Sequence, residues 1–148
     1  MVWGANAYIA KSDIEMIEAV ADVSKWSDRW APCAILESVL NLFLRMRKPM
    51  EDIYGSSFPT LWTAWCDAYK EFYAKGGDIC KDDLAKIKAP TMVIHGMKDA
   101  MVAEEHIHFL HENIPSSKQV IWPEGKHNLH LKYKEEFNQL VQQFLLEE

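Results

Sequence analysis

Two apolar runs of strand length, each followed by a polar loop and a helical pattern, constrain the fold of this chain most strongly. The first run covers residues 91–95 and precedes a helix expected over 104–113, and the second covers 118–122 and precedes a helix expected over 131–146. Strands that are apolar along their whole length and alternate with helices are typical of a parallel sheet covered by helices. The sequence therefore predicts an α/β core over residues 80–148.

Residues 1–79 follow a different pattern. Residues 1–8 are expected to form a first, buried core strand, because the run from Met1 to Ala7 is short and ends at small residues. Residues 9–79 show helical spacing of apolar side chains with no strand between them, and we interpret them as a helical lid or cap. Its helices are expected over residues 13–23 with Ser12 as N-cap, over 35–46, from Pro49 to Tyr54, and over 60–73.

The composition excludes several functional classes. A formal net charge of −6 over 148 residues argues against nucleic acid as a partner, because nucleic-acid readers carry basic faces. No apolar run reaches the ~18 residues of a membrane span, and the first residues lack the features of a signal peptide, so we expect no membrane span and no targeting segment in this chain. Cys33, Cys66 and Cys80 form no C-x-x-C pair and suit a reducing compartment such as the cytoplasm. We expect no cofactor and no metal.

Asp99 and His127 are the candidate catalytic residues. Asp99 lies in the loop after the first apolar run, and His127 lies in the loop after the second. Because the carboxyl ends of parallel strands meet at one edge of a sheet, the two side chains can meet in space. A carboxylate bonded to an imidazole fixes its tautomer and orients the ring for proton transfer. Taken singly, either residue would be an ordinary solvated loop residue, but the pair at successive strand ends predicts an acid and a base.

A nucleophile is missing from this pattern. The order of acid and then histidine is that of α/β hydrolases, in which a serine within G-x-S-x-G precedes both. No G-x-S-x-G occurs in the 148 residues. Ser56 and Ser57 lie in the helical region without a preceding strand, and Ser116 and Ser117 are expected at the amino end of the sheet. None of these four serines is a credible substitute.

Two further patterns have competing interpretations. A metal site at His106, His108 and His111 is conceivable, but His106 would point elsewhere on the helix and no Cys or carboxylate cluster completes a tetrahedral set, so a solvated helix face is the default. The aromatic residues of the lid are expected to form core between lid and sheet, although an inward-facing tryptophan would line a substrate cavity. They are Trp26, Trp62, Trp65, Tyr69, Phe72 and Tyr73.

Five sequence blocks carry a family resemblance: residues 3–8, 22–27, 47–49, 95–99 and 123–130. They resemble the valacyclovir hydrolase (biphenyl hydrolase-like) family of α/β-hydrolase serine esterases, of which this chain corresponds to the C-terminal half. The resemblance implies about three parallel strands with flanking helices and a helical lid. It also implies hydrolysis of small-molecule α-amino-acid esters in the mitochondrion, with Asp99 as the triad acid and His127, rather than His130, as the base.

The same resemblance implies an acyl-side pocket along the first lid helix and the acid loop. Alignment of the blocks at residues 5–8 and 22–26 with the family without gaps brings Met16, Ala19 and Val20 to the lid positions of that pocket, and Met101 lies two residues after the acid. Ordinary core packing is the alternative for all four residues.

Two departures from the family pattern bear on function. The family's N-terminal half, which carries its oxyanion loop and nucleophile, has no counterpart in this sequence, and residues 30–46 form an extra segment rich in Leu that begins at Trp30. We therefore expect the chain to be inactive alone. The alternative is a non-catalytic partner that self-associates through an exposed strand edge or binds the full-length enzyme.

Overall fold

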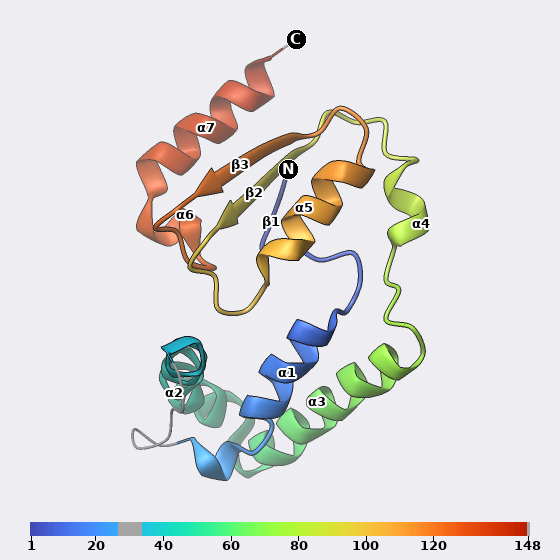
Figure 1. Ribbon diagram of the computed structural model, residues 1–148. Coiled ribbons are helices and arrows are strands. Elements are labelled where there is room, and N and C mark those ends of the chain that lie inside the picture. The colour runs from blue at the N-terminus through green and yellow to red at the C-terminus, as the bar shows by residue number, and fades with distance from the viewer. Residues whose placement is uncertain (27–33, 148) are drawn as a thin grey trace. The chain divides into compact units, whose positions relative to one another are not determined.

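The computed structural model of the chain describes residues 1–26 and 34–147 and divides into two compact units (Figure 1). Unit 1 combines Met1–Ala7 with Cys80–Glu148, and unit 2 is Tyr8–Ile79. Unit 1 is an α/β layer structure, whereas unit 2 is helical. The role of unit 2 as a lid stays a prediction.

Unit 1 is built on a three-stranded parallel sheet in the order β1-β2-β3. Its strands are β1 (Val2–Trp3), β2 (Met92–Gly96) and β3 (Lys118–Trp122). The central strand β2 is buried along its whole length, as its unbroken apolar sequence predicts. Its register pairs Ile94 with Trp3 on one side and with Val120 on the other.

Helices cover this sheet. The cluster of Met92, Ile94, Leu129 and Phe137 joins β2 to α6 (Leu129–Lys132) and α7 (Lys134–Leu146). Alternate residues of β2 face the opposite side, which α5 (Glu104–Asn113) covers (Figure 1). Helix α5 buries its residues Ile107 and Leu110. A short helix, α4 (Lys81–Leu84), precedes β2.

Unit 2 packs its helices around two tryptophans. Its elements are α1 (Lys11–Val20), η1 (Val23–Lys25), α2 (Ala34–Tyr54), η2 (Gly55–Ser57) and α3 (Phe58–Ala74). The indole N–H groups of Trp26 and Trp62 both donate to the carbonyl of Val20, at 3.0 and 2.8 Å. Their rings meet edge to face with centroids 5.3 Å apart, so α1 and α3 are fixed by both packing and hydrogen bonding.

The predicted first strand is wrong in length and burial. β1 covers only Val2–Trp3 instead of residues 1–8, and Trp3 is 39% exposed. Gly4 has φ +54, a left-handed conformation that ends the extended backbone. Tyr8 belongs to unit 2, where it forms an isolated antiparallel bridge with Asp78.

Two predicted helix boundaries also differ. Ala10, rather than Ser12, is the N-cap of α1, and its backbone N–H donates to the carboxylate of Asp13 at 2.7 Å. The last helix is interrupted at Tyr133, whose φ and ψ of −115° and 47° are not helical. The ring of Tyr133 packs edge-on against Trp122, which draws the chain toward the end of β3.

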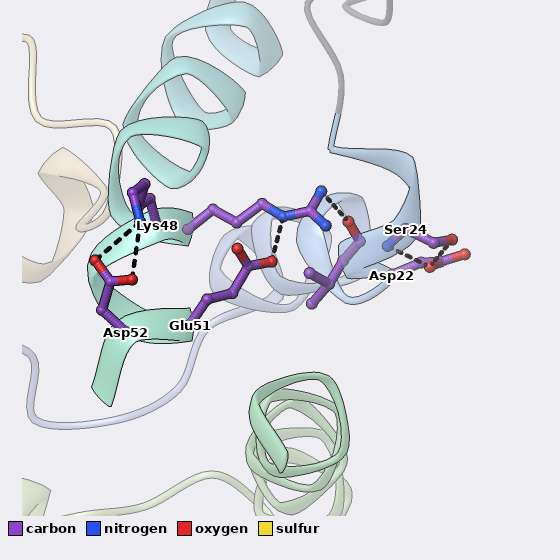
Figure 2. Close-up of polar contacts among 7 residues, drawn as sticks. Asp22, Ser24, Lys48, Glu51 and Asp52 are labelled. Atoms are coloured by element: carbon purple, nitrogen blue, oxygen red, sulfur yellow. Dashed lines mark hydrogen bonds and ion pairs between the residues drawn. The ribbon is translucent and has the colours of Figure 1, made fainter. Parts of the chain in front are cut away.

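The predicted break before Pro49 is absent, since α2 continues through that residue. Two ion pairs at helical spacing bracket the proline: Arg47 with Glu51 and Lys48 with Asp52, each at 2.8 Å. Figure 2 shows the Lys48–Asp52 pair on the last turns of the helix. Such pairs stabilise the turn that loses a backbone hydrogen bond at proline. Most of the extra segment, together with Cys33, has side chains outside the described residues.

Candidate active site

Asp99 is held in the loop that follows β2. Its backbone N–H donates to the carbonyl of Gly96 at 2.9 Å, and its carboxylate is almost fully buried. Oδ1 accepts backbone N–H groups from Met101 at 2.8 Å and from Val102 at 3.1 Å. These two donors satisfy one carboxylate oxygen and orient the other away from them.

His127 completes the contact from the loop that follows β3. Its Nδ1 lies 2.9 Å from Oδ2 of Asp99, and its side chain is 29% exposed. The hydrogen bond to Asp99 raises the pKa of the His127 imidazole, while partial burial opposes that rise. A carboxylate acceptor requires the proton on Nδ1, so Nε2 is the basic nitrogen of the neutral ring.

The two loops are locked together by a contact between two glycines. A Cβ on Gly96 would lie 2.4 Å from both the carbonyl carbon and the oxygen of Gly125. The backbone N–H of Lys98 donates to that same carbonyl oxygen at 2.8 Å, and the N–H of Met97 donates to Trp122 at 3.0 Å. This close backbone approach sets the distance between the acid loop and the histidine loop.

His95 lies beneath this site at the end of β2. It is 3% exposed, and burial lowers its pKa. Asp99 and Glu104 act in the opposite direction on that pKa. A neutral, buried imidazole at this position is consistent with a packing role in the face of the sheet that α5 covers.

The serines of unit 1 lie at the wrong end of the sheet to act on this pair. Ser116 and Ser117 directly precede β3, whereas Asp99 and His127 follow the carboxyl ends of β2 and β3. The Ser117 hydroxyl also bonds to His111, at 2.9 Å from its Nδ1. Neither of these two serines therefore lies at the strand ends that carry the Asp99–His127 pair.

The predicted pocket residues fall into two groups. Met101 is half-buried beside the acid and donates its backbone N–H to Asp99. Met16 and Ala19 are half-buried on α1, while Val20 is buried in the core of unit 2. The burial of Val20 favours the core-packing alternative, and the pocket role of all four stays a prediction.

The described tryptophans of unit 2 also differ in burial. Trp62 is buried against Trp26, and Trp65 is 42% exposed with its ring 5.0 Å from that of Trp62. Unit 2 also contains a hollow of ≈ 460 Å³ bounded in part by Arg47 and Lys70. Each of these cations already has a carboxylate partner, Glu51 at 2.8 Å and Asp67 at 3.6 Å.

The three histidines of α5 have separate surroundings. His106 is buried, His108 Nε2 lies 3.0 Å from Glu104, and His111 contacts Ser117. Among the residues that the structure describes, no group of three or more side chains is arranged to hold a metal ion. Across the same residues, no helix is both long and apolar enough to cross a membrane.

Sequence reasoning missed three glycines of this site: Gly4, Gly96 and Gly125. A Cβ on Gly4 would lie 2.7 Å from Cε1 of His127, and the other two form the contact between loops. The available signal was the position of each glycine: Gly4 and Gly96 directly follow residues 2–3 and the run 91–95, and Gly125 lies three residues after the run 118–122. A glycine at a strand end indicates a close backbone approach.

Comparison with known proteins decides the family. Residues 46–134, more than half of the chain, match the family described as Serine hydrolase (FSH1). The chain belongs to this serine hydrolase family. The predicted resemblance is confirmed at the level of relatives as well, since Serine hydrolase BPHL of Homo sapiens is 37% identical over 147 residues. That alignment covers 98% of this chain but 45% of the relative, so the chain spans about half the relative's length.

Solved structures of low identity show the fold of this serine hydrolase family member. A meta-cleavage product hydrolase from Pseudomonas fluorescens superposes with a TM-score of 0.61 at 18% identity, over 97% of this chain and 53% of that one. An α/β hydrolase enzyme from a deep-sea metagenome library gives 0.60 at 15% identity, over 99% and 55%. The predicted α/β-hydrolase fold class, with three parallel strands and flanking helices, is confirmed.

Proposed function

We propose that this chain supplies the acid and the base of a serine hydrolase that cleaves small-molecule α-amino-acid esters. The observation that carries the proposal is the 2.9 Å contact between His127 Nδ1 and Asp99 Oδ2, with the acid nearly buried. Its two backbone donors hold the acid ready to orient a ring. Membership of the serine hydrolase family supports hydrolysis, and the family resemblance of the five sequence blocks supports the ester class.

In this mechanism Nε2 of His127 takes the proton of a serine hydroxyl as its oxygen attacks the ester carbonyl. Asp99 stabilises the imidazolium that results, and the imidazolium then protonates the departing alkoxide. Water attacks the acyl-serine with Nε2 again as base, which releases the carboxylic acid and restores the serine. The raised pKa of His127 makes the neutral imidazole a stronger base and favours the protonated intermediate, at the expense of the acid strength of the imidazolium.

The 148 residues contain no G-x-S-x-G motif that could supply the serine of this mechanism. The chain by itself is therefore proposed to be inactive toward esters, because a triad without its nucleophile retains only weak residual catalysis. The family resemblance also supports a mitochondrial address for the whole protein.

A fusion protein tests the proposal. The part of human Serine hydrolase BPHL that precedes its aligned region is joined to Met1 of this chain, and hydrolysis of an α-amino-acid ester is measured. The expected result is turnover that His127→Ala and Asp99→Asn each reduce by at least a hundredfold, in line with loss of a base or of its orienting group. A folded fusion without turnover, or with turnover insensitive to His127→Ala, would contradict the proposal.

One observation favours a second, non-catalytic candidate. Met1 and Trp3 are each 39% exposed, and β1 pairs with β2 alone among the described strands. An open strand edge with apolar side chains invites pairing with another strand. Self-association through β1 predicts a concentration-dependent dimer in light scattering that Trp3→Lys converts to monomer. A wild-type chain that is monomeric at all concentrations removes this candidate.

A further inference from the structure

Gly4 lies directly against the ring of His127. It follows β1 with φ +54, so its backbone turns away from the sheet at the strand's carboxyl end. A Cβ at this position would lie 2.7 Å from Cε1, 3.0 Å from Nδ1 and 3.7 Å from Nε2 of the imidazole. The Cα of Gly4 is therefore turned toward the same edge of the ring that carries both nitrogens.

The hydrogen bond to Asp99 depends on this edge of the ring. Nδ1 is the nitrogen that contacts Oδ2, and the carboxylate cannot follow a displaced ring because Oδ1 is held by two backbone N–H groups. The ring itself is the end of a side chain and can swing away from a new methyl group. The easiest response to a Cβ on Gly4 is thus rotation of His127 away from Asp99, with the rest of the fold retained.

We propose that Gly4 is a positioning residue for His127: its bare Cα lets the imidazole sit where Nδ1 reaches Asp99. This inference rests on the proposed function, because the aligned ring matters for catalysis only if His127 is the base. Gly4 comes from β1, so all three strands of the sheet contribute to the pair: β1 through Gly4, β2 through the acid loop and β3 through the histidine loop.

The chain offers a matched control for the substitution. Gly55 has φ +56, nearly the same as Gly4, but a Cβ there would meet nothing within 4 Å. Gly4→Ala and Gly55→Ala therefore introduce the same left-handed backbone strain, and only the first adds a collision with a ring. Any effect on His127 that appears in Gly4→Ala alone comes from the collision.

The test is an NMR titration of the imidazoles in the full chain, with the His127 signal identified by its loss in His127→Gln. Asp99→Asn is expected to lower the pKa of His127 and to remove the downfield signal of its Nδ1 proton. Gly4→Ala is expected to lower that pKa in the same direction and to lose the same signal, whereas Gly55→Ala matches the wild type. If Gly4→Ala does not fold, Gly4→Asn replaces it, because asparagine tolerates a left-handed backbone while still carrying a Cβ.

The outcomes separate the two proposals. If His127 titrates in the folded Gly4 variants as it does in the wild type, the proposed role of Gly4 is overturned. If Asp99→Asn still lowers the pKa of His127 in that case, the proposed acid–base pair stands. An Asp99→Asn variant that titrates like the wild type instead overturns the pair, and with it the proposed function. If Gly55→Ala and Gly4→Ala lower the pKa of His127 by the same amount, the effect comes from backbone strain, and the role of Gly4 is also overturned.

Discussion

The contact between Gly96 and Gly125 gives the sharpest prediction, for the substitution Gly96→Ala. The new Cβ would lie 2.4 Å from the carbonyl carbon and oxygen of Gly125 and 2.9 Å from its Cα, whereas ordinary contacts begin at 3.4 Å. All three atoms are backbone, so no side chain can rotate away to relieve the overlap. One loop has to move by about 1 Å, the difference between the two distances.

That movement has a calculable cost. The Lys98 N–H bond to the Gly125 carbonyl, now 2.8 Å, would stretch to roughly 3.8 Å and be lost. A lost hydrogen bond costs ~0.5–1.5 kcal/mol, and an overpacked position costs ~1–3 kcal/mol. Gly96→Ala is therefore expected to lower the free energy of unfolding by about 2–4 kcal/mol. In urea this lowers the midpoint by about 1–2 M for a chain of this size.

Equilibrium denaturation in urea, followed by tryptophan fluorescence and by circular dichroism, measures the loss. Gly125→Ala is the comparison variant, since its nearest clash is with Cδ2 of Leu129 at 2.3 Å. That atom ends a side chain and can change rotamer at ~0.5–1.5 kcal/mol, so Gly125→Ala should be the milder variant. A loss below ~0.5 kcal/mol for Gly96→Ala, or a larger loss for Gly125→Ala, would refute the account of a rigid contact between backbones.

Three further predictions follow from other contacts. Asp99→Asn should lower the pKa of His127, because the hydrogen bond to Asp99 is the main cause of its rise; a titration that matches the wild type would contradict this. Because the pKa of His127 is raised in the folded state, its contribution to the free energy of unfolding is fully present below the unfolded-state pKa of 6.5 and is lost as pH rises through the folded-state pKa. The urea midpoints of wild type and Asp99→Asn should therefore converge at alkaline pH. Trp62→Phe should cost about 1–3 kcal/mol, from a lost hydrogen bond to Val20 and a smaller ring, and a neutral result would show that Trp26 alone satisfies that carbonyl.

The core of unit 1 was predictable because its elements have strong local signals. The predicted ranges for α5 and β3 match the structure, and β2 is shifted by one residue. Each of these elements combines an apolar pattern of the right period with a clear boundary residue, such as Pro115 before β3. Where the local signal was an apparent breaker, as at Pro49 in α2, ion pairs on either side of it sustained the helix.

The prediction of the first strand over residues 1–8 was wrong for a different reason. Residues 1–8 have apolar composition, but the extent of β1 is set by Gly4, whose left-handed backbone turns the chain against the His127 ring. A single sequence shows that glycine is present without showing which neighbour approaches it. The same holds for Gly96 and Gly125, which lie far apart in sequence and meet only through the parallel pairing of β2 and β3.

The positions of Asp99 and His127 were predictable from topology alone, but their alignment was not. Strand-end loops bring two side chains into the same region, and a hydrogen bond needs a further constraint on each. For Asp99 that constraint is the pair of backbone N–H donors. For His127 it is the close approach of Gly4, which has no Cβ to displace the ring. Both constraints, like the pair itself, are contained in unit 1, from β1 through the histidine loop. The geometry of the acid and base is therefore independent of how unit 2 is arranged, whereas any substrate preference that involves α1 would depend on it.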